Sequence, residues 1–518
     1  MKRLFILASL VAVSATMMAQ DMFEATNFAT KDLNGTARYV GMGGALGALG
    51  GEISTMSSNP AGTGLFRRSD AAFTVGGVFG AKGVLGHDAS RMSLDNGGVV
   101  IALPIDIDGS SVRYVNFGVN YVKNKNFLFN QDTPIQNLGV STDAGIVNLS
   151  QSYQIGDLAT DSYFNPKNLL NPWGALSDMS APMYDDNGNL TKYGLIGENY
   201  TYDPVNDADV FTGFTGFGAD QANMRKSTYG GITQADVNLS MNVLDKFFFG
   251  ASVGLYDIDY NRESFYEELL TVPGVGNAYY DFNNWYKTTG DGVDLKLGFI
   301  CRPIEDSPFR FGLTAHTPTW FKMEDLNGST LHINDAFVSE KYYDPYRYDL
   351  RTPWKLGGSL GYTIGNYFAI GAEYEYQDLS TMKYSQDGLQ TDYFITQNDS
   401  INKNLKGQST IKLGIEVKPT DEFSIRAGYN YVSAPMKDDA YKVIAYDSPF
   451  TETDFTNWKA INRFTFGLGY RYKGGYIDLT YQYSSQKGDF YAFDDIDLKP
   501  TEIKNNRSQI MCTLGFRF

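Results

Sequence analysis

From Ser69 to its end, the chain repeats one pattern, in which apolar residues alternate with polar residues or glycine. In the segment 410–418, for example, Ile411, Leu413 and Ile415 share one face and the residues between them share the other. A period of two is that of a β-strand with one apolar face. The pattern predicts about fourteen strands and an all-β fold. The strands are expected near 69–79, 97–105, 112–123, 228–243, 246–260, 288–303, 308–317, 351–364, 367–378, 406–418, 422–433, 459–473, 475–486 and 506–518.

The connections between these strands alternate between short and long. Short turns are expected at 244–245, 305–307, 365–366, 419–421 and 474, and long connections near 80–96, 124–227, 261–287, 318–350, 379–405, 434–458 and 487–505. Short turns at one end and long loops at the other are typical of outer-membrane barrels, in which the apolar face contacts lipid. A soluble sandwich has no reason to sort its loops in this way. The sequence therefore predicts a transmembrane antiparallel β-barrel over 69–518, with its longest external loop at about 124–227.

Composition agrees with this class and excludes others. Aromatic residues make up 14% of the chain, too many for a disordered protein. The 59 acidic residues exceed the 43 basic ones, which argues against nucleic acid as a partner. No run of about 18 apolar residues is present, so no membrane-spanning helix is expected. Tyr470 and Tyr472 near a strand end fit an aromatic girdle, and Phe518 ends the last strand.

The first twenty residues predict export. Lys2 and Arg3 precede the short apolar run 4–13, and small residues lead to Ala19. This order is that of a signal peptide, and the apolar run is too short to span a membrane. We expect residues 1–20 to be removed and the mature protein to lie in the bacterial outer membrane, in contact with its lipid and lipopolysaccharide.

Residues 21–68 differ from the barrel in being rich in glycine and alanine, above all over 39–51. Small residues allow close backbone packing, and Asn59-Pro60 disfavours a helix at that point. About fourteen strands enclose a lumen too wide for their own side chains to fill. These observations predict a plug at 21–68 inside the barrel, rather than a disordered leader.

The runs 37–45 and 57–62 resemble the hatch of the FadL/TodX family of outer-membrane hydrophobic-compound transporters. Asn59, Pro60 and Ala61 match the family's hatch tripeptide, and Gly62 follows them. The resemblance implies a plugged fourteen-stranded barrel that passes hydrophobic compounds, such as long-chain fatty acids or aromatic hydrocarbons, without energy. It implies that external loops form a first capture site.

The loop near 124–227 carries the aromatic residues that fit such a site. Trp173 is followed by Phe211, Phe214 and Phe217, which are spaced by glycine and threonine. They are candidates for ligand capture at the outer mouth, and packing of the loop's own small core is an equally good interpretation.

The sequence offers little support for a nucleotide site, a metal site or a catalytic site. The run from Gly41 lacks the third glycine of a dinucleotide fingerprint, so no nucleotide is expected. The acidic stretch 185–189 lacks the carboxylates of a calcium loop, and the aspartates at 494–497 are expected to be solvated. No metal site or catalytic residue is predicted.

Haem binding through a histidine is one minor alternative. His87 and His332 are expected in external loops, where either could ligate haem, although loop histidines are usually solvated. Cys301 and Cys512 fall on apolar strand faces and are expected to be free.

The sequence therefore predicts a monomeric passive channel for hydrophobic small molecules, without cofactor or enzymatic activity. Three alternatives remain open: a haem receptor of the same fold, a general porin or surface-interaction barrel, and a barrel enzyme, for which the chain offers no catalytic motif. A porin would conduct ions steadily and would not depend on 21–68.

Overall fold

The computed structural model describes residues 20–518 apart from 81, 137, 143–144, 165–182, 185–189, 193–195, 273–275, 305–306, 335, 343–344, 387–391, 444–451, 494 and 496. The predicted signal peptide thus lies outside the described residues, except for Gln20. No helix among the described residues is long and apolar enough to cross a membrane.

The fold is a closed antiparallel barrel of fourteen strands, which confirms the prediction. Strand β1 (Asp70–Phe79) closes the barrel because it pairs both with β2 (Ser90–Pro104) and with the last strand, β25 (Thr501–Arg517). Four of the fourteen strands are each made of more than one segment. These segments are β3 (Val112–Asn126) with β4 (Phe129–Pro134), β14 (Arg310–His316) with β15 (Trp320–Ile333), β16 (Ala336–Tyr342) with β17 (Tyr346–Arg351) and β18 (Lys355–Ile364), and β19 (Phe368–Asp378) with β20 (Lys383–Ser385).

The remaining barrel segments follow in chain order. They are β11 (Ala219–Val243), β12 (Phe247–Val272), β13 (Gly276–Cys301), β21 (Gly407–Val417), β22 (Phe423–Val432), β23 (Phe455–Tyr472) and β24 (Gly475–Tyr491).

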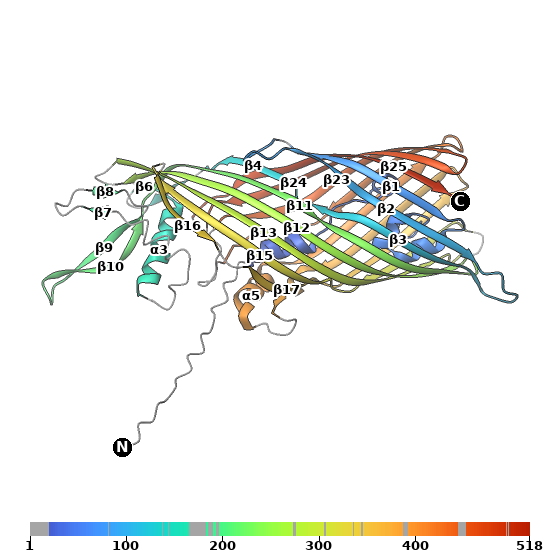
Figure 1. The fold of residues 1–518 in the computed structure, drawn as a ribbon, viewed down its shortest axis with the longest axis horizontal. Helices are drawn as coiled ribbons and strands as arrows, with labels where there is room; N and C mark the ends of the chain where they lie inside the picture. Colours follow the sequence, from blue (N-terminus) through green and yellow to red (C-terminus); the bar gives the residue numbers. More distant parts are fainter. Residues whose placement is uncertain are drawn as a thin grey trace, which may run out of the picture.

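The smaller elements lie at one end, which we call the outer end (Figure 1). They include β5 (Gly139–Thr142), β6 (Gly145–Asn148), α3 (Gln151–Phe164), β7 (Met183–Tyr184), β8 (Leu190–Lys192), β9 (Ile196–Asp203) and β10 (Ala208–Gly216). The 3₁₀ turns η4 (Leu379–Thr381) and η5 (Asp392–Phe394) and helix α5 (Ile395–Asn404) lie between β19 and β21. The short turns and the C-terminus lie at the opposite, inner end (Figure 1).

The segment 20–69, which we call the plug, lies inside the barrel, where its blue helices are visible in Figure 1. It comprises α1 (Met22–Ala29), α2 (Ala37–Gly41), η1 (Ile53–Ser57) and η2 (Pro60–Leu65). Helix α1 begins where the side chain of Asp21 accepts a hydrogen bond from the Glu24 N–H, at 2.8 Å. Helix α2 begins in the same way at Thr36, which accepts from the Tyr39 N–H at 3.2 Å.

Glycines of the barrel wall allow the plug backbone to touch the strands. A Cβ atom at Gly371 would overlap the Ala45 carbonyl, and one at Gly414 would overlap the Met42 carbonyl. The same holds at Gly250, Gly298 and Gly428, which face Pro60, Asn59 and Gly43. Wall and plug therefore pack backbone against backbone, which explains the glycine content on the inner face.

Buried ion pairs add to this contact at the inner end. Arg38 of the plug contacts Glu416 of β21 at 3.1 Å, and Arg426 of β22 contacts the same carboxylate at 2.6 Å. Burial opposes the charge of Arg38, but Glu416 and Glu52 outweigh it and raise the pKa of Arg38 above its usual range. The plug is thus fixed by charge as well as by shape.

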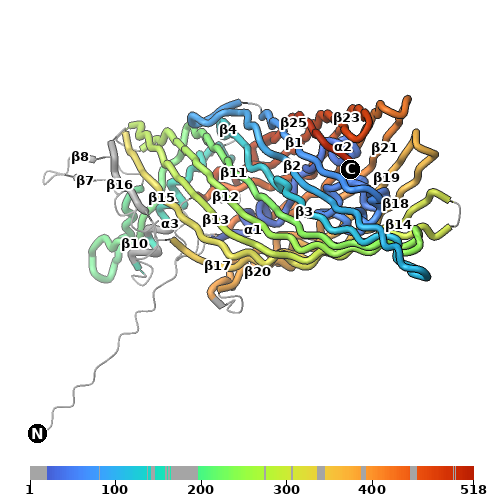
Figure 2. Tube along the Cα trace, turned by 45° about the vertical axis from the view of Figure 1, so that its right-hand side comes forward, coloured from blue at the N-terminus to red at the C-terminus, as the bar shows by residue number. Residues whose placement is uncertain are grey.

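The strands extend further outward than the sequence pattern indicated. Strands β12 and β13 run to Val272 and from Gly276, so the predicted loop 261–287 is largely strand. The predicted loop 318–350 contains β15, β16 and most of β17. In both places the prediction of a long loop is wrong. Figure 2 shows β11, β12, β13 and β15 running side by side to the outer end.

The side on which apolar residues lie reverses along these strands, which explains the error. On β12, Phe249, Val253 and Leu255 face outward and are exposed, as in a lipid-facing band. Beyond this point Asp257 faces outward, while Tyr256 and the inward residues after it are buried. Where the apolar residues switch from the outward to the inward side in mid-strand, the sequence pattern looks the same as at the end of a strand. The sixteen residues from Asp257 to Val272 extend the wall about 40 Å beyond the lipid band at ordinary rise and tilt.

Candidate functional site

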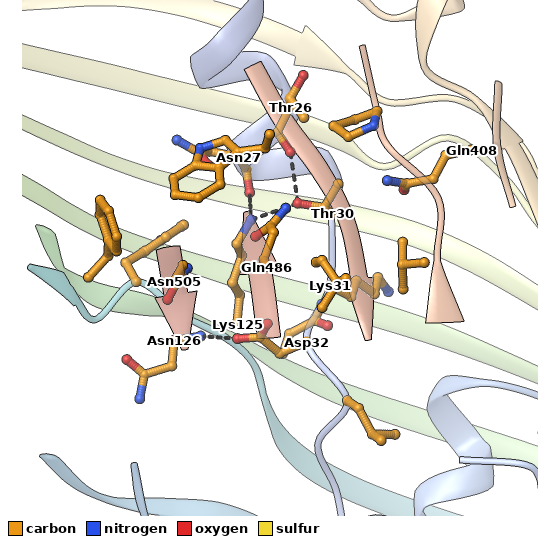
Figure 3. Close-up of a pocket in the computed structure, with 18 of the residues that line it drawn as sticks. Thr26, Asn27, Thr30, Lys31, Asp32, Lys125, Asn126, Gln408, Gln486 and Asn505 are labelled. Carbon is orange, nitrogen blue, oxygen red and sulfur yellow. Dashed lines mark hydrogen bonds between the residues drawn. The ribbon is translucent and has the colours of Figure 1, made fainter. Parts of the chain in front are cut away.

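A cavity of 280 Å³ lies between the plug and the barrel wall (Figure 3). Most of its wall residues come from β3, β4 and β21–β25, and others come from β11, β12, β14, β18 and β19. Its volume is near the lower end of the range for small-molecule sites. Its apolar lining includes Phe23 of α1, Phe129 of β4, and Phe455 and Trp458 of β23. The Phe129 and Trp458 rings meet edge to face at 5.3 Å, which gives the cavity an aromatic corner.

The floor of the cavity is the chain that leaves α1. The ammonium group of Lys125 donates to the Asn27 carbonyl at 2.6 Å and to the Thr30 hydroxyl at 2.7 Å (Figure 3). The Asp32 carboxylate accepts from the Asn126 N–H at 3.0 Å and from Arg507 at 3.2 Å. These bonds hold the end of α1 against β3 and β25.

Asp32 is held in its charged form. Burial alone would raise the pKa of Asp32, but the guanidinium groups of Arg507 and Arg463 outweigh burial and lower it. Arg463 lies 3.4 Å from the carboxylate and is 2% exposed. Both arginines already hold the Asp32 carboxylate, which occupies part of their hydrogen-bonding capacity, although one negative charge leaves this side of the cavity positive overall.

Lys31 and Lys355 are better candidates for holding an anionic ligand, because neither forms an ion pair with any residue that the structure describes. Lys31 instead donates to the Tyr256 hydroxyl at 3.0 Å and to the Gln234 amide oxygen at 3.4 Å. Burial and then repulsion from Lys355 lower the pKa of Lys31 to about 7. Both lysines line the cavity without a described carboxylate in direct contact, although Glu375 attracts Lys355 and Asp294 attracts Lys31 at longer range.

A charged cluster closes the cavity toward the outer end. Arg262 of β12 pairs with Glu24 of α1, and it contacts Glu452 at 2.6 Å. Lys226 of β11 pairs with Asp454, and Lys442 lies 3.3 Å from Asp21. The side chains of this cluster are buried, so α1 is tied to the residues that precede β23.

Neighbours of this charged cluster contact the outer loop. Gln151, at the start of α3, donates to the Thr453 hydroxyl at 2.9 Å. Glu268 of β12 accepts from the Gln151 N–H at 2.9 Å and from the Tyr280 hydroxyl at 2.8 Å. One buried network therefore joins the outer loop, the barrel wall and the plug.

The candidate capture aromatics are partly brought together. The Phe211 ring lies 5.1 Å from Phe214 and 6.1 Å from Phe164, where β10 packs on α3. Phe214 and Phe217 pack against a buried apolar cluster at the outer end. Trp173 lies outside the described residues. A role in ligand capture stays a prediction, as does the alternative of loop packing.

The hatch motif lies at the inner end, where η2 meets the wall. Asn59 accepts from the Ala61 N–H at 3.2 Å and donates to the Gly47 carbonyl at 2.9 Å. Pro60 begins η2, and the Gly62 N–H donates to the Asn59 carbonyl at 2.9 Å. The motif therefore fixes the plug and does not line the cavity. Its assignment as a family hatch motif stays a prediction.

The other singled-out residues have ordinary partners. His87 stacks on Tyr229 at 4.6 Å, outside the cavity. His332 lies on β15 and not in a loop, contrary to the prediction, and contacts Asp281 at 3.0 Å. Cys301 and Cys512 are free, as predicted. The stretch 185–189 lies outside the described residues, and so does Asp494.

No group of three or more histidine, cysteine or acidic residues able to hold a metal ion occurs in the described part of the chain.

The cavity residues could not be identified from the sequence. Lys31 and Lys355 lie more than three hundred positions apart, and parity alone does not show which inward residues converge. One usable signal was present, because inward glycines such as Gly414 and Gly428 mark where the plug touches the wall.

No protein-family model matches the chain, and no curated protein matches it. Several solved structures are similar over 94% of this chain. A FadL homologue of Pseudomonas aeruginosa is covered over 99% of its length, at 13% identity and a TM-score of 0.48. The toluene transporters TodX of P. putida and TbuX of Ralstonia pickettii are each covered over 99%, at 14% identity and TM-scores of 0.47 and 0.44.

Proposed function

We propose that this chain is a passive channel of the bacterial outer membrane that passes hydrophobic small molecules with an acidic head group, such as long-chain fatty acids. The observation that carries the proposal is the cavity between plug and wall, which joins an aromatic corner to two lysines that form no ion pair with a described residue. An apolar tail and an anionic head together match such a lining. The hatch resemblance at Asn59, Pro60 and Ala61 supports the same class.

The lysines favour an acid over a neutral hydrocarbon. A buried ammonium group without a counter-ion is costly, and a bound carboxylate would relieve that cost. Lys31 and Lys355 would hold the carboxylate, while Phe129, Phe455 and Trp458 would contact the tail. No energy source or chemical step is required, because the compound moves down its gradient once the plug yields.

The alternatives receive less support from the site. Of the three histidines only His316 lines the cavity, and its Nε2 already contacts the Ser58 carbonyl at 2.7 Å, so haem ligation is not favoured. A plug packed backbone against backbone on the wall does not suit an open porin.

Mass spectrometry of organic extracts tests the proposal. The detergent-purified protein is compared with a porin prepared in the same way and with a Lys31→Met/Lys355→Met double variant. We expect a stoichiometric fatty acid in the wild-type extract and at least a fivefold smaller amount in the double variant. An extract that matches the porin's would contradict the proposal.

A further inference from the structure

The cavity has a second polar side, which Lys31 and Lys355 do not explain. In Figure 3, Asn126 and Asn505 lie on the side opposite Lys31 and Gln408, with Lys125 between them. Gln131 of β4 and Gln486 of β24 also line the cavity. A site for a simple fatty acid needs one polar end and an apolar remainder. Carboxamides at both ends therefore call for another account.

Two of these amides carry a hydrogen-bond donor that has no partner among the described residues. The Asn126 side-chain oxygen accepts from the Leu128 N–H at 3.0 Å, which leaves its Nδ2 group unpaired. The Nε2 group of Gln131 is also unpaired. Asn126 is 7% exposed and Gln131 is 5% exposed. An unsatisfied buried donor costs about 1–3 kcal/mol, so a ligand oxygen that reached these two nitrogens would be favoured. Both nitrogens are covered in this structure, so a ligand would reach them through a rotation of the side chain. The unpaired oxygens of Glu24 and Asp454 also line the cavity, within the charged cluster.

The surroundings of these donors fit a neutral acceptor. Phe129 lies in sequence between Asn126 and Gln131, and its ring meets Trp458. Two cations beside these donors already have partners: Arg507 donates to the Asn126 carbonyl at 2.8 Å and pairs with Asp32, and Lys226, opposite Gln131 on β11, pairs with Asp454. Two amide donors beside an aromatic pair suit a hydroxyl or carbonyl oxygen on an otherwise apolar chain.

We infer that the ligand is an acid with a second oxygen function near its other end, a hydroxyl or a carbonyl, bound by Asn126 and Gln131. This inference rests on the proposed function and narrows its substrate class. A hydrocarbon or an unsubstituted fatty acid leaves both donors unpaired, whereas a hydroxylated acid satisfies them. Sites that hydrogen-bond a substrate hydroxyl discriminate against the analogue that lacks it.

The test uses two probes that differ only at the far end, dodecanoic acid and 12-hydroxydodecanoic acid. Their dissociation constants are measured by calorimetry on the purified full-length protein in detergent. We expect the hydroxy acid to bind about tenfold more tightly, as two added hydrogen bonds predict. This ratio needs only the wild-type protein, so it tests the inference even if a variant fails to fold.

Two variants and a control test whether residues on this side of the cavity cause the difference in affinity between the two acids. Asn126→Leu, which is close to Asn in size, removes one unpaired donor, and Gln131→Met removes the other. Each should lower the ratio toward one without weakening the binding of dodecanoic acid. Gln482→Met is the control, because Gln482 faces the lumen outside the cavity and pairs with Gln509.

The outcomes separate this inference from the proposed function. Equal binding of the two acids by the wild type overturns the inference and leaves the proposed function standing. A wild-type preference that survives in both variants also overturns it, because the hydroxyl is then recognised elsewhere. If neither acid binds, the proposed function fails and the inference fails with it.

Discussion

The charge state of Lys31 depends both on its burial and on whether a ligand is bound. Its pKa of about 7 lies below the ordinary 10.5, so its charge is present below pH 7 and is lost as the pH rises. A bound carboxylate favours the charged form of Lys31 and so keeps it charged to a higher pH. The charged and titratable groups that act on it are Lys355, Asp294, Lys296 and Asp236.

We therefore expect the affinity for dodecanoic acid to fall about tenfold between pH 6 and pH 9, because one charge-assisted contact is lost. Dodecanol, which carries no charge, is the control ligand and should bind equally at both values. Lys31→Met should flatten the profile for the acid. An acid profile that stays steep in this variant would assign the titration to another group.

The wall glycines allow the plug backbone to lie against the strands, and a larger residue at one of them should displace the plug. Gly414→Val forces a side chain into the Met42 carbonyl and should destabilise the protein by about 2 kcal/mol, as other overpacked sites do. It should also raise the resting conductance in planar bilayers, because the plug is displaced. Gly358→Val is the matched control, since a Cβ at Gly358 meets no atom within 4 Å. Equal conductance of the two variants would show that the plug does not seal the lumen.

At the scale of elements, the residues just before β23 connect α1 to the outer loop. Glu452 accepts from Ser264 and contacts Arg262, which in turn pairs with Glu24 of α1. Breaking a buried ion pair costs about 3–5 kcal/mol. Since this cost falls on a local contact, it should appear as easier opening of α1 rather than as global unfolding.

Glu452→Gln should therefore speed amide hydrogen exchange in residues 20–30 by about a hundredfold, measured by mass spectrometry. Glu502→Gln is the control, because the pair between Glu502 and Lys487 is half exposed and contributes little. Exchange in α1 that is no faster in Glu452→Gln than in the control would rule out this connection.

The elements also show what a sequence can and cannot predict. The strands near the inner end follow from alternation, and the turn at Leu244–Asp245 from its position between two such runs; both residues adopt positive φ there. The outer parts of β12 and β13 were missed because the apolar side changes at Leu255 and Tyr256. The cavity was missed because its lining converges from strands that are distant in sequence, which only the closed barrel brings together.

At the scale of the whole molecule, the barrel has two environments along its length. The outward residues of β11 are apolar from Ala235 to Val243, whereas Thr233 lies level with Asp257 beyond the lipid band. A strand segment of this length is what spans the hydrocarbon core of a bilayer. We infer that the wall beyond it extends into water, and its interior holds apolar clusters together with buried ion pairs such as that of Arg262.

Leu239→Arg, in the middle of this band, should destabilise the protein in lipid vesicles by about 2–4 kcal/mol. Thr233→Arg, on the same face of the same strand, should change the stability by less than about 0.5 kcal/mol. Guanidinium unfolding of the two variants measures the difference. Equal effects would place the membrane elsewhere on the barrel.

The proposed channel function depends on where the ligand binds, and photolabelling measures this directly. A dodecanoic acid with a diazirine near its tail is irradiated with the purified protein, and adducts are mapped by peptide mass spectrometry with and without excess dodecanoic acid. We predict competed adducts on α1, on residues 122–131 and on residues 455–463, which line the cavity. Adducts confined to the outward apolar residues of the barrel, or adducts that excess acid does not reduce, would contradict this prediction.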